Sequence, residues 1–321
     1  MIFSKKIEAL YRKAMFSRQE KSEAVFFFTP SDFPGLNDEP YSFTSSKGHT
    51  LAGHLYSYPS PTEDKIIIFD HGMGAGHLAY MKEIELLARH GYLVFAYDHT
   101  GCASSGGEGT GGFGQSVRDL DDCITAIKGD ARFNGRRIAV VGHSWGAFST
   151  MNIVRLHRDV THIVAIAGLI SLKQILKQNF PGPLGLYKKR LTEIERESNP
   201  NHYSLDAIES LKDSQVKALL IYSENDTFVK KAFHYDLLAE SLKDSQNVRL
   251  MLVEGKGHNP NYTKNAVRVK DEYFALLQKK LKEGALNDTE AQRKFASEFD
   301  FDAMTEQDEA VWDEILKHLE S

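Results

Sequence analysis

Short runs of hydrophobic residues alternate with amphipathic stretches along most of this sequence. The runs are rich in Val, Ile, Leu, Phe and Tyr, which is typical of buried β-strands. We predict strands at residues 24–28, 41–45, 51–58, 65–70, 92–98, 137–142, 162–168, 217–223 and 248–254. From residue 65 onward, apolar residues at intervals of three and four predict helices between the strands. These helices are expected at residues 78–90, 114–128, 144–157, 230–243 and 262–283.

The order of these elements indicates the fold class. Strands that are apolar throughout and separated by helices are typical of a parallel sheet that is covered on both faces. The first runs have no helices between them, so they predict an antiparallel lead-in. We therefore predict an α/β protein with a mostly parallel central sheet of about eight strands, helices on both faces and a small helical cap.

Three segments lie outside this alternation. Residues 1–22 begin with a basic amphipathic pattern, which predicts a helix that packs on the body of the protein. Residues 171–212 hold a Pro/Gly-rich stretch between helical patterns and predict a small cap, inserted in a core domain that spans residues 23–284. Residues 285–321 predict a helical extension of net charge −8, from eleven acidic and three basic residues.

Composition and charge narrow the class of protein. The net charge is −5 at pH 7 and no dense Lys/Arg stripe is present, so we expect no nucleic-acid partner. Two cysteines, Cys102 and Cys123, are too few for a disulfide framework, which fits a reducing compartment. The sequence shows no apolar run long enough to span a bilayer and no signal-peptide pattern. We expect a cytoplasmic protein without stable membrane insertion.

A serine between two glycines follows one of the predicted strands. Gly142-His-Ser144-Trp-Gly146 comes directly after the strand at 137–142 and opens the next helix. Small neighbours allow a serine on a tight strand-to-helix turn to present its hydroxyl clear of the backbone. The first amides of the helix then favour negative charge that develops at the site. Ser144 is therefore the candidate nucleophile.

A nucleophilic serine needs a base and an acid that orients the base. The serine motif resembles that of α/β-hydrolases, and this resemblance implies that the acid and then the histidine follow the serine along the chain. His258 lies in a Gly-rich loop directly after a predicted strand, whereas His234 lies within a helical pattern and His318 in the acidic extension. For the acid we prefer Asp226, which lies deeper in its turn and precedes an apolar pair. Glu224 follows the same strand and remains the alternative.

Acyl transfer also needs amide groups that stabilise an oxyanion. The glycine-rich segment His71-Gly-Met-Gly74 follows a predicted strand and can bring the N–H of Met73 to the substrate. The second donor is expected to be the N–H of Trp145, the residue after the nucleophile, and its indole is expected to line the pocket. Gly72 and His143 adjoin the same two segments and are expected to contact the substrate.

Together these motifs resemble those of the α/β-hydrolase superfamily, and in particular its serine esterase and lysophospholipase-like branch with a short cap. The matching stretches are HGMG, GYLVFAYDHTGCASSGG, GHSWG, ENDTFV and GKGH, within residues 40–283. The resemblance implies a serine hydrolase that needs no cofactor. It also implies a catalytic triad and two oxyanion donors, which are Ser144, Asp226, His258, Met73 and Trp145.

One loop departs from the family pattern. Where the family usually has D-x-R-G-x-G-x-S, this sequence reads Asp98-His-Thr100-Gly101-Cys-Ala103-Ser-Ser105. Thr100 and Ala103 stand in place of an arginine and a glycine. Because the loop supports the site in this family, the departure bears on the substrate class more than on the mechanism.

We expect hydrolysis of a small-molecule carboxylic ester with a small or medium acyl group. A thioesterase, or an amidase or peptidase, would use the same triad, and a hydrolase-fold protein that binds a ligand without turnover is a further alternative. No metal site is expected, because the histidines lack H-E-x-x-H spacing. The C-terminal extension offers a surface for a homo-oligomer, although docking on its own core explains its apolar stripe more simply. The stripe consists of Val311, Trp312, Ile315, Leu316 and Leu319.

Overall fold

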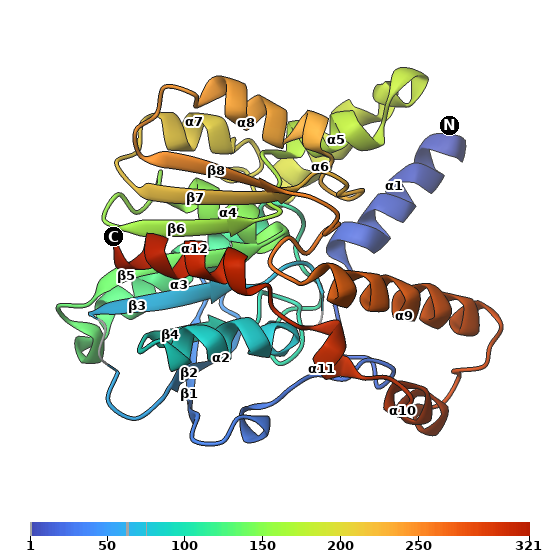
Figure 1. Ribbon diagram of the computed structural model, residues 1–321. Coiled ribbons are helices and arrows are strands. Elements are labelled where there is room, and N and C mark those ends of the chain that lie inside the picture. The colour runs from blue at the N-terminus through green and yellow to red at the C-terminus, as the bar shows by residue number, and fades with distance from the viewer. Residues whose placement is uncertain (1, 62–63, 75) are drawn as a thin grey trace.

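The computed structural model describes residues 2–61, 64–74 and 76–321, and its described residues form an eight-stranded sheet (Figure 1). The strand order is β1-β2-β4-β3-β5-β6-β7-β8. β2 pairs antiparallel with β1 and with β4, and all other neighbours are parallel. The mostly parallel sheet with an antiparallel lead-in is therefore confirmed. The strands are β1 (Asn37–Thr44), β2 (Thr50–Ser57), β3 (Lys65–Asp70), β4 (Leu93–Tyr97), β5 (Arg137–His143), β6 (His162–Ile166), β7 (Lys217–Ser223) and β8 (Val248–Val253).

Helices cover both faces of the sheet, as predicted. Figure 1 shows α2 and α12 in front of the strands and α3 and α4 behind them. The α-helices are α1 (Ile2–Phe16), α2 (Met81–Arg89), α3 (Gln115–Gly129), α4 (Trp145–Ile153), α5 (Leu172–Asn179), α6 (Lys188–Ser198), α7 (Ala207–Lys212), α8 (Tyr235–Ser241), α9 (Lys264–Lys282), α10 (Thr289–Ser297), α11 (Phe301–Met304) and α12 (Glu309–Glu320). Single 3-10 turns lie between several of them, including η4 (Gly182–Tyr187).

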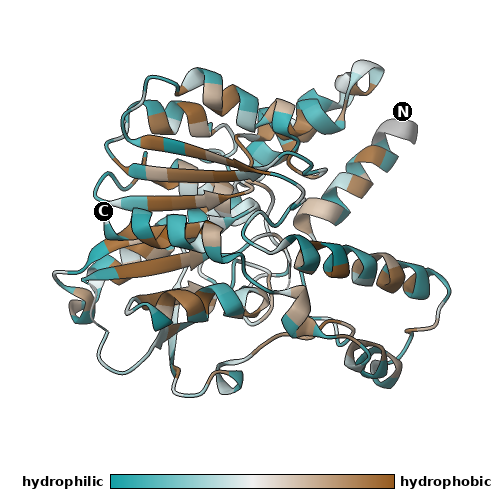
Figure 2. Ribbon diagram, in the orientation of Figure 1, coloured by the Kyte–Doolittle hydropathy of each residue, from teal (hydrophilic) through white to brown (hydrophobic). Residues whose placement is uncertain are grey.

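Each face of the sheet carries a hydrophobic core, because successive side chains of a strand point to opposite faces. In β3, Ile66 and Ile68 pack in the cluster that contains α3 and α4, whereas Ile67 and Phe69 pack in the cluster that contains α2 and α12. Figure 2 shows the central strands largely brown, while the helices carry teal on the sides that face away. The continuous apolar runs of the sequence thus correspond to strands that are buried on both faces.

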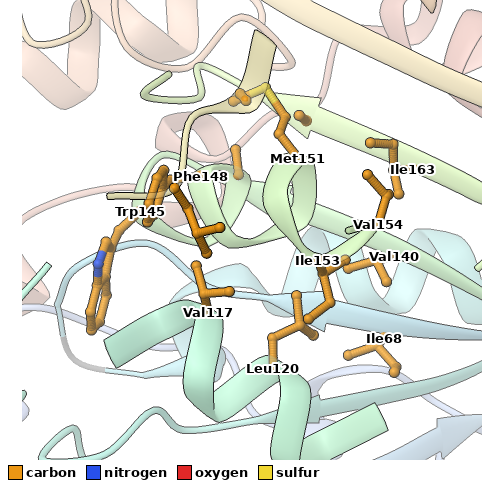
Figure 3. Close-up of a cluster of buried hydrophobic side chains, with 14 of the residues drawn as sticks. Ile68, Val117, Leu120, Val140, Trp145, Phe148, Met151, Ile153, Val154 and Ile163 are labelled. Carbon is orange, nitrogen blue, oxygen red and sulfur yellow. The ribbon is translucent and has the colours of Figure 1, made fainter. Parts of the chain in front are cut away.

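The helix that follows the candidate nucleophile lies at the centre of one face and is buried along its whole length. Figure 3 shows Phe148 and Ile153 of α4 near Val117 and Leu120 of α3 and near Val140 of β5. Its polar side chains, Ser149, Thr150 and Asn152, donate to carbonyls of the same helix, so the helix can be buried on all sides. This packing holds the first residue of α4, Trp145, in a fixed position at the end of the sheet.

The predicted strand at 24–28 is wrong, because these residues pair with no strand in the described part of the chain. Ala24 instead packs with Tyr273 of α9 and Phe301 of α11, and the Tyr273 hydroxyl donates to the Ala24 carbonyl. Ala24 is therefore buried against the C-terminal helices, whereas Phe28 is half-buried there and Phe26 is 45% exposed. A run of apolar residues forms a β-strand only where a neighbouring strand pairs with it, and residues 24–28 have no such neighbour among the described strands.

Residues 171–212 contain α5, η4, α6 and α7, and these parts differ in position. α5, η4 and α6 project beside α1 at one end of the sheet (Figure 1). α7 belongs to the core layer, since Ala207 and Leu211 are buried beside α4 and Ser210 donates to Asn152 at 2.8 Å. The segment that covers the sheet's end is thus shorter than the whole insertion.

Candidate active site

Ser144 lies on a strained turn between β5 and α4. Its backbone has φ of 55° and ψ of −111°, a left-handed conformation that side chains with a Cβ adopt at a cost of about 1–3 kcal/mol. The two flanking glycines are needed for close packing. A Cβ at Gly142 would overlap Thr150, and one at Gly146 would overlap the Asp70 carbonyl. The two glycines of the motif are therefore explained by the lack of space for a side chain on either side of Ser144.

Three side chains from separate loops form one hydrogen-bonded chain. The Ser144 hydroxyl lies 2.8 Å from His258 Nε2, and His258 Nδ1 lies 2.7 Å from Asp226 Oδ2. In this arrangement the imidazole can accept the serine proton while Nδ1–H donates to the carboxylate. The structure thus brings together the three residues that the sequence pattern selected.

Asp226 is the carboxylate that faces the histidine. It follows β7, is 5% exposed, and its Oδ1 accepts the amides of Phe228 at 2.8 Å and Val229 at 2.9 Å. The other oxygen, Oδ2, is therefore left for His258. Glu224, the alternative from the sequence, is exposed at the same strand end.

The loop that carries His258 is tied to the end of β7. Asn225 Oδ1 accepts the Gly257 amide at 2.9 Å, and Ser223 Oγ accepts the Lys256 amide at 3.1 Å. Both side chains also hydrogen-bond each other at 2.8 Å. Sequence reasoning missed Ser223 and Asn225, since polar residues at a strand end carry no signal of which loop they will hold.

Two backbone amides near Ser144 are free to bind an anion. Neither the amide of Met73 nor that of Trp145 donates a hydrogen bond to the described residues. Trp145 opens α4, where the first amides of a helix lack intrahelical acceptors. Both residues line the same pocket as Ser144 and His258, and their role as oxyanion donors stays a prediction.

Gly72 and His143 lie beside the site in a hydrogen-bonded chain rather than among the residues that line the pocket. The Gly72 amide donates to the Tyr80 hydroxyl at 3.1 Å, the hydroxyl donates to His143 Nδ1 at 2.9 Å, and His143 Nε2 donates to the His258 carbonyl at 2.8 Å. Burial, together with the neighbouring His258, lowers the pKa of His143 well below its usual value. The neutral ring thereby connects the glycine-rich loop with the loop of His258, and the expected contact of both residues with substrate stays a prediction.

His99, Asp70 and Asp119 form a buried charged cluster next to the site. His99 Nε2 lies 2.9 Å from Asp70 Oδ1, and His99 Nδ1 lies 3.3 Å from Asp119 Oδ2. Burial alone would lower the pKa of His99, but the two carboxylates outweigh it and raise this pKa to about 10. The imidazolium ring packs against the Trp145 indole, with ring centroids 4.9 Å apart. It therefore braces the residue whose amide faces the pocket.

The loop that departs from the family pattern receives a guanidinium from elsewhere in the chain. Arg18 donates to the carbonyls of Ala103 at 2.5 Å, Ser105 at 2.9 Å and Gly107 at 2.8 Å. Ala103 itself has φ of 38°, in the region that favours glycine. Thr100 donates to Asp119 at 2.8 Å. Residues after α1 thus stabilise a loop whose own sequence is unfavourable for its conformation.

An apolar pocket of about 550 Å³ opens above Ser144. In the described part of the chain its lining contains no Asp, Glu, Lys or Arg, and its titratable groups are Tyr11 and His258. The remaining lining is mainly aliphatic and aromatic, contributed by α1, by α5 and by the loop after Asp226. Such a surface favours an uncharged, apolar substrate group.

Two further classes of feature are absent from the described residues. Within residues 2–61, 64–74 and 76–321, no group of three or more His, Cys, Asp or Glu residues is arranged to hold a metal ion. None of the helices in the same ranges has the length and apolar character needed to cross a bilayer.

Comparison with known proteins gives a match to one sequence family and a likeness to several solved structures. The family described as Serine aminopeptidase, S33 matches residues 61–250. None of the curated proteins compared with the sequence matches it.

The solved structures that resemble this chain include hydrolases from three organisms. An esterase from Pyrococcus furiosus is 21% identical, with 84% of this chain and 98% of that chain covered and a TM-score of 0.59. An acetyl xylan esterase from a Paenibacillus species is 15% identical, with 80% and 88% covered and a TM-score of 0.55. An α/β hydrolase from a Penicillium species is 18% identical, with 81% and 99% covered and a TM-score of 0.53. At these identities the likeness shows a common fold.

Proposed function

Since the chain belongs to the serine aminopeptidase, S33 family of α/β hydrolases, we propose that it hydrolyses carboxylic esters with Ser144 as the nucleophile. The observation that carries the proposal is the hydrogen-bonded chain from Ser144 through His258 to Asp226 at the base of an apolar pocket. A hydroxyl becomes a competent nucleophile when a positioned base accepts its proton.

In the proposed reaction Ser144 Oγ attacks the ester carbonyl while His258 Nε2 takes its proton. Asp226 keeps Nδ1 protonated and stabilises the imidazolium. The amides of Met73 and Trp145 bind the oxyanion of the tetrahedral intermediate. His258 then gives its proton to the leaving alcohol, and the acyl group stays on Ser144. A water molecule, deprotonated by the same imidazole, releases the acid and restores the hydroxyl.

The lining of the pocket favours an uncharged ester as the substrate over a peptide with a charged N-terminal amino group. An aminopeptidase holds a charged amino group, and such a cation needs a carboxylate or several hydrogen-bond acceptors when it is taken out of water. The described pocket residues include no carboxylate. Thioesters and neutral amides fit the same geometry and are the alternatives within the same mechanism.

Replacement of Ser144 tests the proposal directly. Ser144→Ala should lower kcat for p-nitrophenyl butyrate by about 10⁴-fold or more, because the acyl-enzyme can no longer form. The far-ultraviolet circular dichroism spectrum should be unchanged. A fluorophosphonate probe should label the wild-type protein at Ser144 and leave the variant unlabelled. Retention of most of the esterase activity by Ser144→Ala would refute the assignment, and a wild-type protein without labelling would favour ligand binding without turnover.

A further inference from the structure

The N-terminal helix α1 forms one wall of the pocket above Ser144. Its contribution is a single helical face, because residues three and four positions apart lie on the same side of a helix. The α1 residues that line the pocket are Ile7, Leu10, Tyr11, Ala14 and Met15. α1 precedes residues 61–250, the part of the chain that matches the family. The α1 wall therefore lies outside the part of the chain that the family match covers.

The apolar face of α1 is only partly covered by the protein, since Tyr11, Met15 and Phe16 pack against the main core cluster. An amphipathic helix normally buries that face against a core, yet Leu10 is 58% exposed. Across the pocket, Phe228 is 70% exposed. Exposed apolar side chains on both sides of a concave site form a surface that an apolar ligand would cover.

Polar contacts along its flanks hold α1 in this position. The Tyr11 hydroxyl donates to Glu195 Oε1 of α6 at 2.6 Å, and Arg190 of α6 reaches Glu8 at 3.2 Å. Arg18, just after the helix, donates to three carbonyls of the loop that follows β4. These contacts hold the wall at the edge of the pocket without filling it.

The same contacts connect α1 with the reacting centre. Glu195 Oε2 accepts the Phe113 amide at 2.7 Å, and the Phe113 carbonyl accepts Trp145 Nε1 at 2.7 Å. The wall is therefore positioned relative to the residue whose amide is the proposed oxyanion donor. A chain that extends from an ester bound at Ser144 would run along α1.

We propose that α1 is the specificity-determining wall of this enzyme and that it binds the linear, uncharged aliphatic chain of the ester substrate. This inference rests on the proposed function, which supplies the ester hydrolysis. The selectivity among esters is inferred from the face of α1 that lines the pocket. The small side chain of Ala14 leaves room in the wall for that chain. The enzyme then selects esters by the length of their aliphatic chain, because a longer chain makes more contact with α1. Each methylene buried in this way raises kcat/KM by about fourfold until the pocket is filled.

A matched pair of substitutions on one helix tests the proposal. Ala14 lines the pocket, whereas Ala9 lies on the same helix, is exposed, and is not among the residues that line it. With p-nitrophenyl esters from acetate to octanoate, Ala14→Trp should lower the octanoate-to-acetate ratio of kcat/KM by about tenfold or more, because the indole occupies the space of the chain. Ala9→Trp should keep the wild-type ratio. A parallel series of alkyl acetates shows whether the chain lies on the acyl or the alcohol side.

The outcomes separate this inference from the proposed function. If fluorophosphonate labels all the proteins at Ser144 but Ala14→Trp keeps the wild-type length profile in both series, the role of α1 is overturned. If the wild-type protein is not labelled, binding of linear methyl ketones of increasing length still tests α1 without turnover. Affinity that rises with length, and that falls in Ala14→Trp but not in Ala9→Trp, supports the wall; equal affinities overturn it. Should Ala14→Trp fail to fold, Leu10→Ala must lower the same ratio, and an unchanged ratio overturns the inference.

Discussion

Asp226 divides its two carboxylate oxygens between different partners. Oδ1 accepts the backbone amides of Phe228 and Val229, so Oδ2 is directed at His258 Nδ1. A carboxylate fixed in this way favours the imidazole tautomer whose Nε2 can accept the Ser144 proton. Glu224 lies two residues earlier, but its side chain is exposed to solvent.

These two carboxylates can be distinguished by isosteric substitution. Asp226→Asn should lower kcat for p-nitrophenyl butyrate by about 10⁴-fold, because the amide favours the wrong imidazole tautomer. Glu224→Gln is the matched control and should keep the wild-type kcat. Steady-state kinetics at constant pH measures both. The opposite pattern would assign the orienting role to Glu224.

At the scale of elements, α12 covers a face of the sheet that α9 leaves open. After β8 the chain continues into α9, which extends away from the sheet and packs with α10 and α11 (Figure 1). α12 then returns and buries Trp312 and Ile315 against the sheet. Asp308 caps this helix through the Val311 amide at 3.1 Å and also pairs with Lys256 in the loop of His258 at 2.5 Å. The apolar stripe of the acidic extension thus docks on the sheet of its own chain through α12.

The contribution of α12 to stability can be measured by removal of its largest buried side chain. Trp312→Ala should lower the free energy of unfolding by about 3–5 kcal/mol, because it leaves a cavity between α12 and the sheet. Asp313→Ala, on the exposed side of the same helix, should change it by less than about 0.5 kcal/mol. Urea unfolding followed by circular dichroism provides the comparison. Equal effects of the two substitutions would show that α12 is not docked as described.

At the scale of the whole molecule, several histidines are buried as neutral rings. Burial, with a smaller effect from the His99 cation, lowers the pKa of His71 to about 3. Burial also lowers the pKa of His234 to about 4. In the unfolded chain both would take up a proton near pH 6.5. The stability that these rings confer is therefore complete above that pH and is lost as the pH falls toward their folded pKa values.

His99 has the opposite dependence. Its raised folded pKa of about 10 means that its contribution is complete below about pH 6.5 and is lost as the pH rises through 10. Since His71 and His234 lose stability on the acidic side and His99 on the alkaline side, these three residues together favour greatest stability near neutral pH.

Acid should therefore destabilise the fold before it protonates most carboxylates. Between pH 7 and pH 5 the free energy of unfolding should fall by on the order of 2 kcal/mol or more, as the unfolded state binds protons that buried histidines exclude. His234→Leu should reduce this pH dependence, and His90→Gln, at an exposed position, should leave it unchanged. Urea unfolding at both pH values measures the slope. A free energy that is constant over this range would contradict the neutral, buried state of these rings.

Features that depend on local patterns could be predicted from the amino-acid sequence. Apolar runs and helical periodicity located the eight strands and the helices between them, because the periods of two and 3.6 residues follow from backbone geometry. The order of Ser144, Asp226 and His258, each after its own strand, was enough to predict that they meet. The carboxyl ends of parallel strands lie at one edge of the sheet, so residues that follow those strands gather there.

Features that depend on contacts between distant segments could not be predicted from local patterns. The run at 24–28 packs on C-terminal helices, Arg18 supports the loop at Ala103, and Tyr80 links Gly72 to His143. The open face of α1 and the docking of α12 are of the same kind. An amphipathic pattern states that a helix has an apolar face, but what covers that face is settled by the elements that fold beside it. For α12 the sheet covers this face, whereas for α1 the core covers part of it and the rest lines the pocket.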